Sequence, residues 1–73
     1  MENNELRLNR KIYDLKDINF SVQSYKGIAD ISIQQVECYT ICKFTNCTYG
    51  LTQTMQEFEN YLIQYSNSKR YTL

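Results

Sequence analysis

One amphipathic helix near the C-terminal end of the sequence most constrains the fold. Five apolar side chains recur there at steps of four, three, four and three residues: Leu51, Met55, Phe58, Leu62 and Tyr65. Residues three or four apart share a helix face, so this spacing predicts a helix over 51–65. Thr54 and Glu57 fit a capping box near its start. Burial of the stripe is offset by the conformational entropy lost on ordering the helix, so the first fifty residues must provide a surface for it.

A second helix and three strands are predicted in those fifty residues. Asp14 is a suitable N-cap, an apolar stripe follows it, and Gly27 marks the end, so we expect a helix from Leu15 to Lys26. Alternating apolar and polar residues indicate the strands, and Gln35-Val36-Glu37 is a plausible turn between the last two. The predicted strands cover residues 5–12, 28–35 and 38–45.

The element order β-α-β-β-α places the protein in the α+β class. We expect one domain over 1–73, with a three-stranded sheet, both helices on one of its faces, and frayed tails over 1–4 and 67–73. A chain of 73 residues builds only a marginal core, and self-association, most simply as a homodimer, would extend it.

Charge and hydropathy narrow the possible partners. Eight basic and eight acidic residues cancel, and the pI is about 6.1, which argues against binding to nucleic acid or an anionic membrane mainly through charge. The N-terminal residues are polar and acidic, and no apolar run approaches the ~20 residues of a membrane span. We therefore expect a cytoplasmic protein without a membrane partner.

The residue types of most catalytic sites are missing. The sequence has no histidine, which excludes imidazole acid–base chemistry, and its two glycines cannot form a phosphate-binding loop. Cys38, Cys42 and Cys47 raise the alternative of a metal or iron–sulfur site, but the first two lie about 13 Å apart on an extended strand. Reduced cysteines acting as small apolar side chains fit better. We expect no cofactor, no metal and no enzymatic activity.

Several apolar residues fall outside the predicted core faces. Phe20 lies opposite the stripe of the first helix, and Ile63 lies beside the stripe of the second. The strand over 38–45 is apolar in both phases, so whichever phase faces the helices, the other leaves apolar side chains in water. Single exposed apolar residues are common and need no partner, but a doubly apolar strand favours a covered second face. The candidate interface residues are Phe20, Tyr39, Ile41, Cys42, Phe44 and Ile63.

The sequence resembles the small HxsD-like accessory proteins of the His-Xaa-Ser system family over roughly residues 6–70. The matching positions are Ile12-Tyr13, Leu15, Ile18, Ala29, Ile31, Ile33, Tyr39, Ile41, Phe58, Asn60, Leu62 and Arg70. The resemblance implies an accessory protein encoded beside radical SAM enzymes that mature ribosomal peptides. It transfers no catalytic residue.

Two functional hypotheses follow. The first is a non-catalytic interaction protein that binds a peptide or a radical SAM maturase, for instance by adding a peptide strand to its sheet. The alternative is a small KH-like nucleic-acid-binding or regulatory protein, with basic residues gathered at one end: Arg7, Arg10, Lys11, Lys69 and Arg70. The absence of a GXXG loop and the zero net charge make nucleic acid the less favoured partner.

Overall fold

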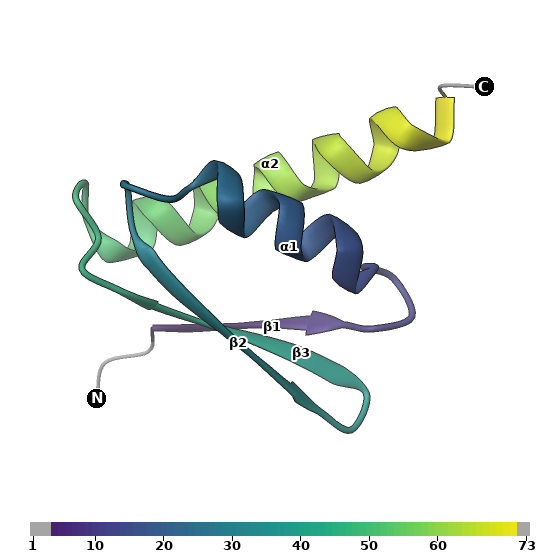
Figure 1. Cartoon of the computed structure of the whole chain (residues 1–73), viewed down its shortest axis with the longest axis horizontal. Helices are drawn as coiled ribbons and strands as arrows, with labels where there is room; N and C mark the ends of the chain where they lie inside the picture. Colours follow the sequence, from purple (N-terminus) through teal and green to yellow (C-terminus); the bar gives the residue numbers. More distant parts are fainter. Residues whose placement is uncertain (1–3, 72–73) are drawn as a thin grey trace.

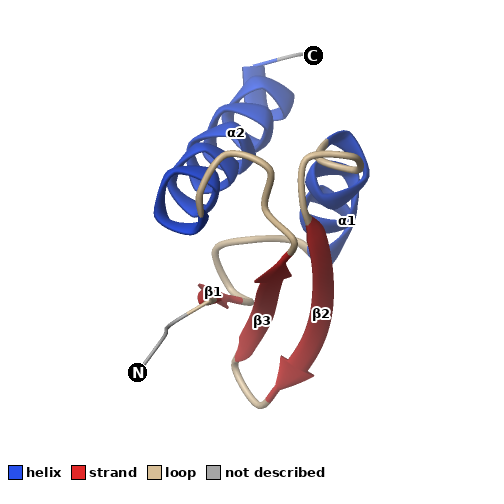
Figure 2. Ribbon diagram, turned by 90° about the vertical axis from the view of Figure 1, so that its left-hand side faces the viewer, coloured by secondary structure: helices blue, strands red, loops and turns tan. Residues whose placement is uncertain are grey.

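The computed structural model describes residues 4–71, with side chains through residue 68, as three strands and two helices. The elements are β1 (Glu5–Asn9), α1 (Leu15–Ser24), β2 (Asp30–Val36), β3 (Tyr39–Thr45) and α2 (Leu51–Tyr71). The strands form one antiparallel sheet in the order β1-β3-β2, so β3 is central and β1 and β2 are the edges. Both helices cover the same face of the sheet (Figures 1 and 2), which confirms the predicted α+β architecture.

The core lies between this face and the helices. It is built from seven buried residues: Leu8, Ile18, Ala29, Cys42, Phe44, Phe58 and Leu62. The Phe44 ring of β3 meets the Phe58 ring of α2 edge to face, with 5.3 Å between centroids, and Tyr25, the C-cap residue of α1, meets the same Phe58 ring at 5.4 Å. One aromatic side chain of α2 therefore joins the sheet to α1, as expected for the apolar stripe of a helix that is not stable alone.

The two helices run antiparallel, and polar and aromatic side chains meet between them. Ser66 Oγ donates to Asp17 Oδ2 at 3.1 Å, Phe20 stacks on Tyr65 with 4.2 Å between centroids, and the hydroxyls of Ser24 and Tyr61 lie 2.9 Å apart. The hydrogen bond from Ser66 also explains why Asp17 is tolerated at a buried position, because it satisfies one oxygen of the carboxylate.

Helix α2 begins and ends differently from the prediction. Gly50 has φ of 100°, and its carbonyl accepts the first helical bond from the Thr54 N–H at 3.0 Å, so Gly50 occupies the N-cap position. The prediction of a capping box at Thr54 and Glu57 is therefore wrong, because Thr54 is buried within the helix. The helix continues through residue 71, beyond the end predicted at residue 65, and residues 72–73 of the predicted tail lie outside the described range.

Other boundaries also differ from the predictions, among them the end of α1, which lies at Ser24 rather than Lys26. β1 ends at Asn9 rather than 12, because the Asn9 carbonyl accepts the N–H groups of Ile12 and Tyr13 in the turn that follows. The hairpin turn falls on Glu37 and Cys38, one to two residues later than expected, with Glu37 at φ of 52°. At the N-terminus, the backbone of residue 4 already pairs with β3, and residues 1–3 of the predicted tail lie outside the described range.

Candidate functional site

The backbone hydrogen bonds of β3 define which groups of the sheet remain unpaired. The Phe44 N–H donates to the Asn4 carbonyl, and the Arg10 N–H donates to the Cys38 carbonyl, each at 2.9 Å. In antiparallel strands the direction of the backbone N–H and C=O groups alternates along the chain. The backbone groups of even-numbered residues of β3 therefore point toward β1, and those of odd-numbered residues point toward β2. With Ile41 opposite Gln34, the even-numbered residues of β2 then face β3.

The odd-numbered residues of β2 consequently direct their N–H and C=O groups away from the sheet. These residues are Ile31, Ile33 and Gln35, and no backbone hydrogen bond within the described part of the chain occupies these outward groups. An unpaired strand edge of this kind is a template for another extended chain. The edge of β2 is therefore able to accept a fourth strand.

A groove runs beside this edge, beneath α1. It has a volume of about 290 Å³ and is lined by residues of α1 and β2, with contributions from the turn between them and from β3: Val22, Gln23, Lys26, Ala29, Asp30, Ile31, Ser32 and Thr45. A second hollow of about 300 Å³ lies at the far end of β2, where Leu15 and Gln35 line it together with the buried Thr40. Figure 2 shows α1 above β2 and α2 on the β1 side of the helix layer.

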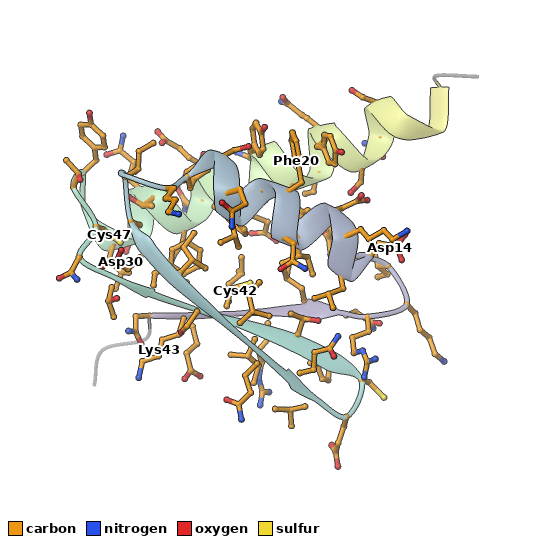
Figure 3. The ribbon with its side chains drawn as sticks, in the orientation of Figure 1. Asp14, Phe20, Asp30, Cys42, Lys43 and Cys47 are labelled. Atoms are coloured by element: carbon orange, nitrogen blue, oxygen red, sulfur yellow. The ribbon has the colours of Figure 1, made fainter. Side chains whose placement is uncertain are left out.

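One basic and one acidic side chain line the groove. Lys26 lines it from the residues that follow α1, and the one carboxylate among the lining residues belongs to Asp30. That carboxylate accepts a hydrogen bond from Asn46 Nδ2 at 2.8 Å, which holds it toward the loop after β3 (Figure 3 shows Asp30 at this end of the sheet). Lys26 therefore supplies a cationic group at the end of the groove where β2 begins.

The opposite edge, β1, also borders a hollow beneath a helix. Leu6 and Met55 line a space of about 210 Å³ with Thr52, Gln56 and Glu59. β1 is two residues shorter than β2, and the carbonyl of its last residue, Asn9, is already used by the turn that follows. This edge offers fewer unpaired backbone groups than β2 does.

The sheet face away from the helices carries a small apolar area within polar surroundings. Tyr39 is 41% exposed, Val36 is 37% exposed and Ile41 is half-buried. The Arg7 guanidinium lies 5.6 Å from the centroid of the Tyr39 ring, in cation–π geometry. Lys43 points away from the helices on this face (Figure 3).

The six candidate interface residues do not form one surface. Tyr39 and Ile41 lie on the open face, whereas Cys42 and Phe44 are in the core with 0% and 1% exposure and are removed from the candidate interface. The remaining two residues lie on the helices. Phe20 is 45% exposed and stacks on α2, while Ile63 is 36% exposed on α2.

The three cysteines have free thiols in different environments. Cys38 is exposed in the hairpin turn, Cys47 is half-buried, and burial raises the pKa of the Cys42 thiol to about 11. Between residues 4 and 71, no three side chains of the types that bind metals lie together. The buried thiol behaves as an apolar core group, because the protonated form is the one favoured inside.

The basic residues of the nucleic-acid hypothesis are distributed over different parts of the structure. Arg7 lies on the open face against Tyr39, and Arg10 Nη1 donates to the Glu37 carbonyl at 2.9 Å, which ties the hairpin turn to the segment after β1. Lys11 follows in the same segment, and the side chains of Lys69 and Arg70 lie outside the described part.

Sequence reasoning did not identify the β2 edge, because strand order is not a local property. Two strands joined by a tight turn are expected to pair, but the sequence does not say whether β1 lies beside β2 or beside β3.

Comparison of the chain with protein-family models, curated proteins and solved structures finds no match. Within the described residues, no helix is both long enough and apolar enough to span a membrane.

Proposed function

We propose that this protein is a non-catalytic accessory protein that holds an extended segment of a partner at an edge of its sheet. The observation that carries the proposal is the row of unpaired backbone groups on Ile31, Ile33 and Gln35. Ile31 lines the groove of about 290 Å³ at one end of this row, and Gln35 lines the hollow of about 300 Å³ at the other. Main-chain hydrogen bonds supply affinity in this type of recognition, and pockets for alternate side chains supply selectivity.

The sequence resemblance supplies the biological setting of the proposal. In that setting the partner is a ribosomal peptide undergoing maturation, or the radical SAM enzyme that modifies it, in the cytoplasm. The absence of histidine from the 73 residues supports a binding role over a catalytic one.

Co-expression with the proteins encoded beside it tests this function. We expect a tagged version of this protein to retain a neighbouring peptide or enzyme through purification. Retention of no partner by a folded protein would contradict the proposal.

We also propose that the protein forms a homodimer through the open face of the sheet. Tyr39, Ile41 and Val36 supply the apolar area there, and the structure makes a diagnostic substitution possible because Tyr39 is not part of the core. Sedimentation at micromolar concentration should show a dimer for the unmodified protein and a folded monomer for Tyr39→Lys. A monomeric unmodified protein would refute the dimer.

A further inference from the structure

Standard dimensions of helices and strands give a layer of two helices that is wider than a sheet of three strands. Packed helices have axes 8–10 Å apart and diameters of about 10–12 Å, so two of them cover about 20 Å. Three strands at about 4.8 Å spacing cover only about 14 Å. The helices therefore overhang the sheet edges, which is consistent with the hollows found beneath α1 beside β2 and beneath α2 beside β1. One additional strand widens the sheet to about 19 Å and matches the helix layer.

We infer that the groove between α1 and β2 takes a single extended peptide from another protein, antiparallel to β2, with apolar residues at two alternate positions and an acidic residue beside Lys26. This inference rests on the proposed function and specifies the edge and the chemistry of the ligand. β2 is favoured over β1 because it is longer and because all three of its outward-facing carbonyls lack a backbone partner within the described part of the chain.

The ligand pattern follows from the register of an added strand. Residues directly opposite each other in antiparallel strands place their side chains on the same face. Ligand residues opposite Ile31 and Ile33 therefore lie on the helix side of the sheet. The first lies in the groove that Val22 and Ile31 line, and the second lies beside Ile33, which packs against the core, so apolar side chains suit both positions. The residue between them, opposite Ser32, lies on the open face and is polar.

The acidic position follows from the direction of the ligand. In an antiparallel ligand, the residue two positions beyond the one opposite Ile31 lies opposite Ala29, again on the helix side. Ala29 and Lys26 both line the groove and are three residues apart in the chain, so we place a carboxylate at this ligand position next to the ammonium group. The carboxylate of Asp30 competes little for Lys26, because it is held by Asn46.

A second copy of this chain is a poor occupant of the same edge. Pairing two β2 edges gives six strands, about 29 Å wide, beneath four helices that need about 40 Å. The overhanging α1 helices of the two copies would then collide above the junction. A peptide strand has no helix layer of its own and avoids this clash. The homodimer proposed above uses the open face and leaves the edge unoccupied.

The test uses the end-capped peptide TTVTVTE and the full chain. Nuclear magnetic resonance titration should show that the peptide shifts the amide signals of Ile31, Ile33 and Gln35 more than those of Glu5 and Arg7 on the other edge. The isomer TTVVTTE, which directs one valine to the open face, should bind several-fold more weakly. Lys26→Glu should weaken binding of the first peptide and favour the same peptide ending in lysine.

N-methylation of the peptide provides the matched control. Methylating the amides of both valines, which face β2, should lower affinity at least about tenfold, because each lost hydrogen bond leaves a desolvated partner. Methylating the two threonines at positions four and six, whose amides face away, should change affinity by less than about twofold.

Three outcomes would overturn the inference. These are no binding at millimolar peptide, equal sensitivity to both methylation patterns, and signal changes confined to the β1 edge. None of them removes a partner retained in co-expression, so they leave the proposed function standing. A dimer that dissociates when Gln35→Pro blocks the β2 edge would identify a second copy as the occupant and would also overturn the inference.

Discussion

Proline substitution at two neighbouring positions of β2 provides a sharp test of the strand register. Gln34 and Gln35 are both exposed, adjacent and chemically identical, yet their N–H groups point in opposite directions. Proline at 34 removes the donor that pairs with the Ile41 carbonyl, and its ring would meet β3. Proline at 35 removes only an outward N–H, a position that edge strands tolerate.

The expected magnitudes are well separated. Loss of a ladder bond that leaves a carbonyl unsatisfied costs about 1–3 kcal/mol, and the misplaced ring adds to it, so Gln34→Pro should lower the free energy of unfolding by about 2–4 kcal/mol. Gln35→Pro also restricts the unfolded chain, which offsets part of any strain, and should change that free energy by less than about 1 kcal/mol.

Thermal unfolding followed by circular dichroism measures the difference. For a domain of this size, 1 kcal/mol corresponds to about 4–8 °C, so a difference of at least about 1 kcal/mol should lower the Tm of Gln34→Pro by at least about 4 °C relative to Gln35→Pro. Equal Tm values, or a larger loss for Gln35→Pro, would refute the assignment of outward and inward groups on β2.

Three other predictions concern single residues. Glu37→Gly should raise the free energy of unfolding by about 1 kcal/mol in urea titration, because φ of 52° strains a non-glycine residue, and a decrease would contradict that reading. Thr40→Val should stabilise the protein by about 1 kcal/mol, since the buried Thr40 hydroxyl has no hydrogen-bond partner among the described residues; a loss would indicate a partner for it. The pKa of the Cys42 thiol is raised from 9.0 to about 11 by burial, so its stabilising contribution is complete below about pH 9 and is lost, up to about 3 kcal/mol, as the pH rises to about 11. Cys42→Ala should lack this component of the pH dependence, and identical slopes for the two proteins would refute it.

Local sequence patterns predicted the elements because each has its own periodicity. The stripes of both helices and the three alternating segments correspond to observed elements, and both helices cover one face as expected. The phase of β3 was left open, because Tyr39 and Ile41 are as apolar as Cys42 and Phe44. In the structure, Phe44 packs against Phe58 of α2, so the set of β3 side chains that includes Phe44 faces the helices.

The remaining differences come from contacts between distant parts of the chain. The hairpin turn uses Glu37 at positive φ, a position where sequence rules expect glycine or asparagine, and Arg10 Nη1 contacts its carbonyl from another segment. The candidate site depends on strand order and on the overhang of α1, which no local pattern encodes. Of this site, the sequence shows only the alternation of Ile31 and Ile33 with polar residues, which predicts a half-buried strand but not a strand edge.

Hydrogen exchange of the β2 amides, measured with and without the partner retained in co-expression, tests the central claim most directly. In the free protein, the amides of Ile31, Ile33 and Gln35 should exchange faster than those of Ser32 and Gln34, because their hydrogens face solvent rather than β3. Binding of the partner should slow exchange at these three positions, and Gln35→Pro should weaken that binding. Unchanged exchange at all three in a complex that has formed would contradict recognition at the β2 edge.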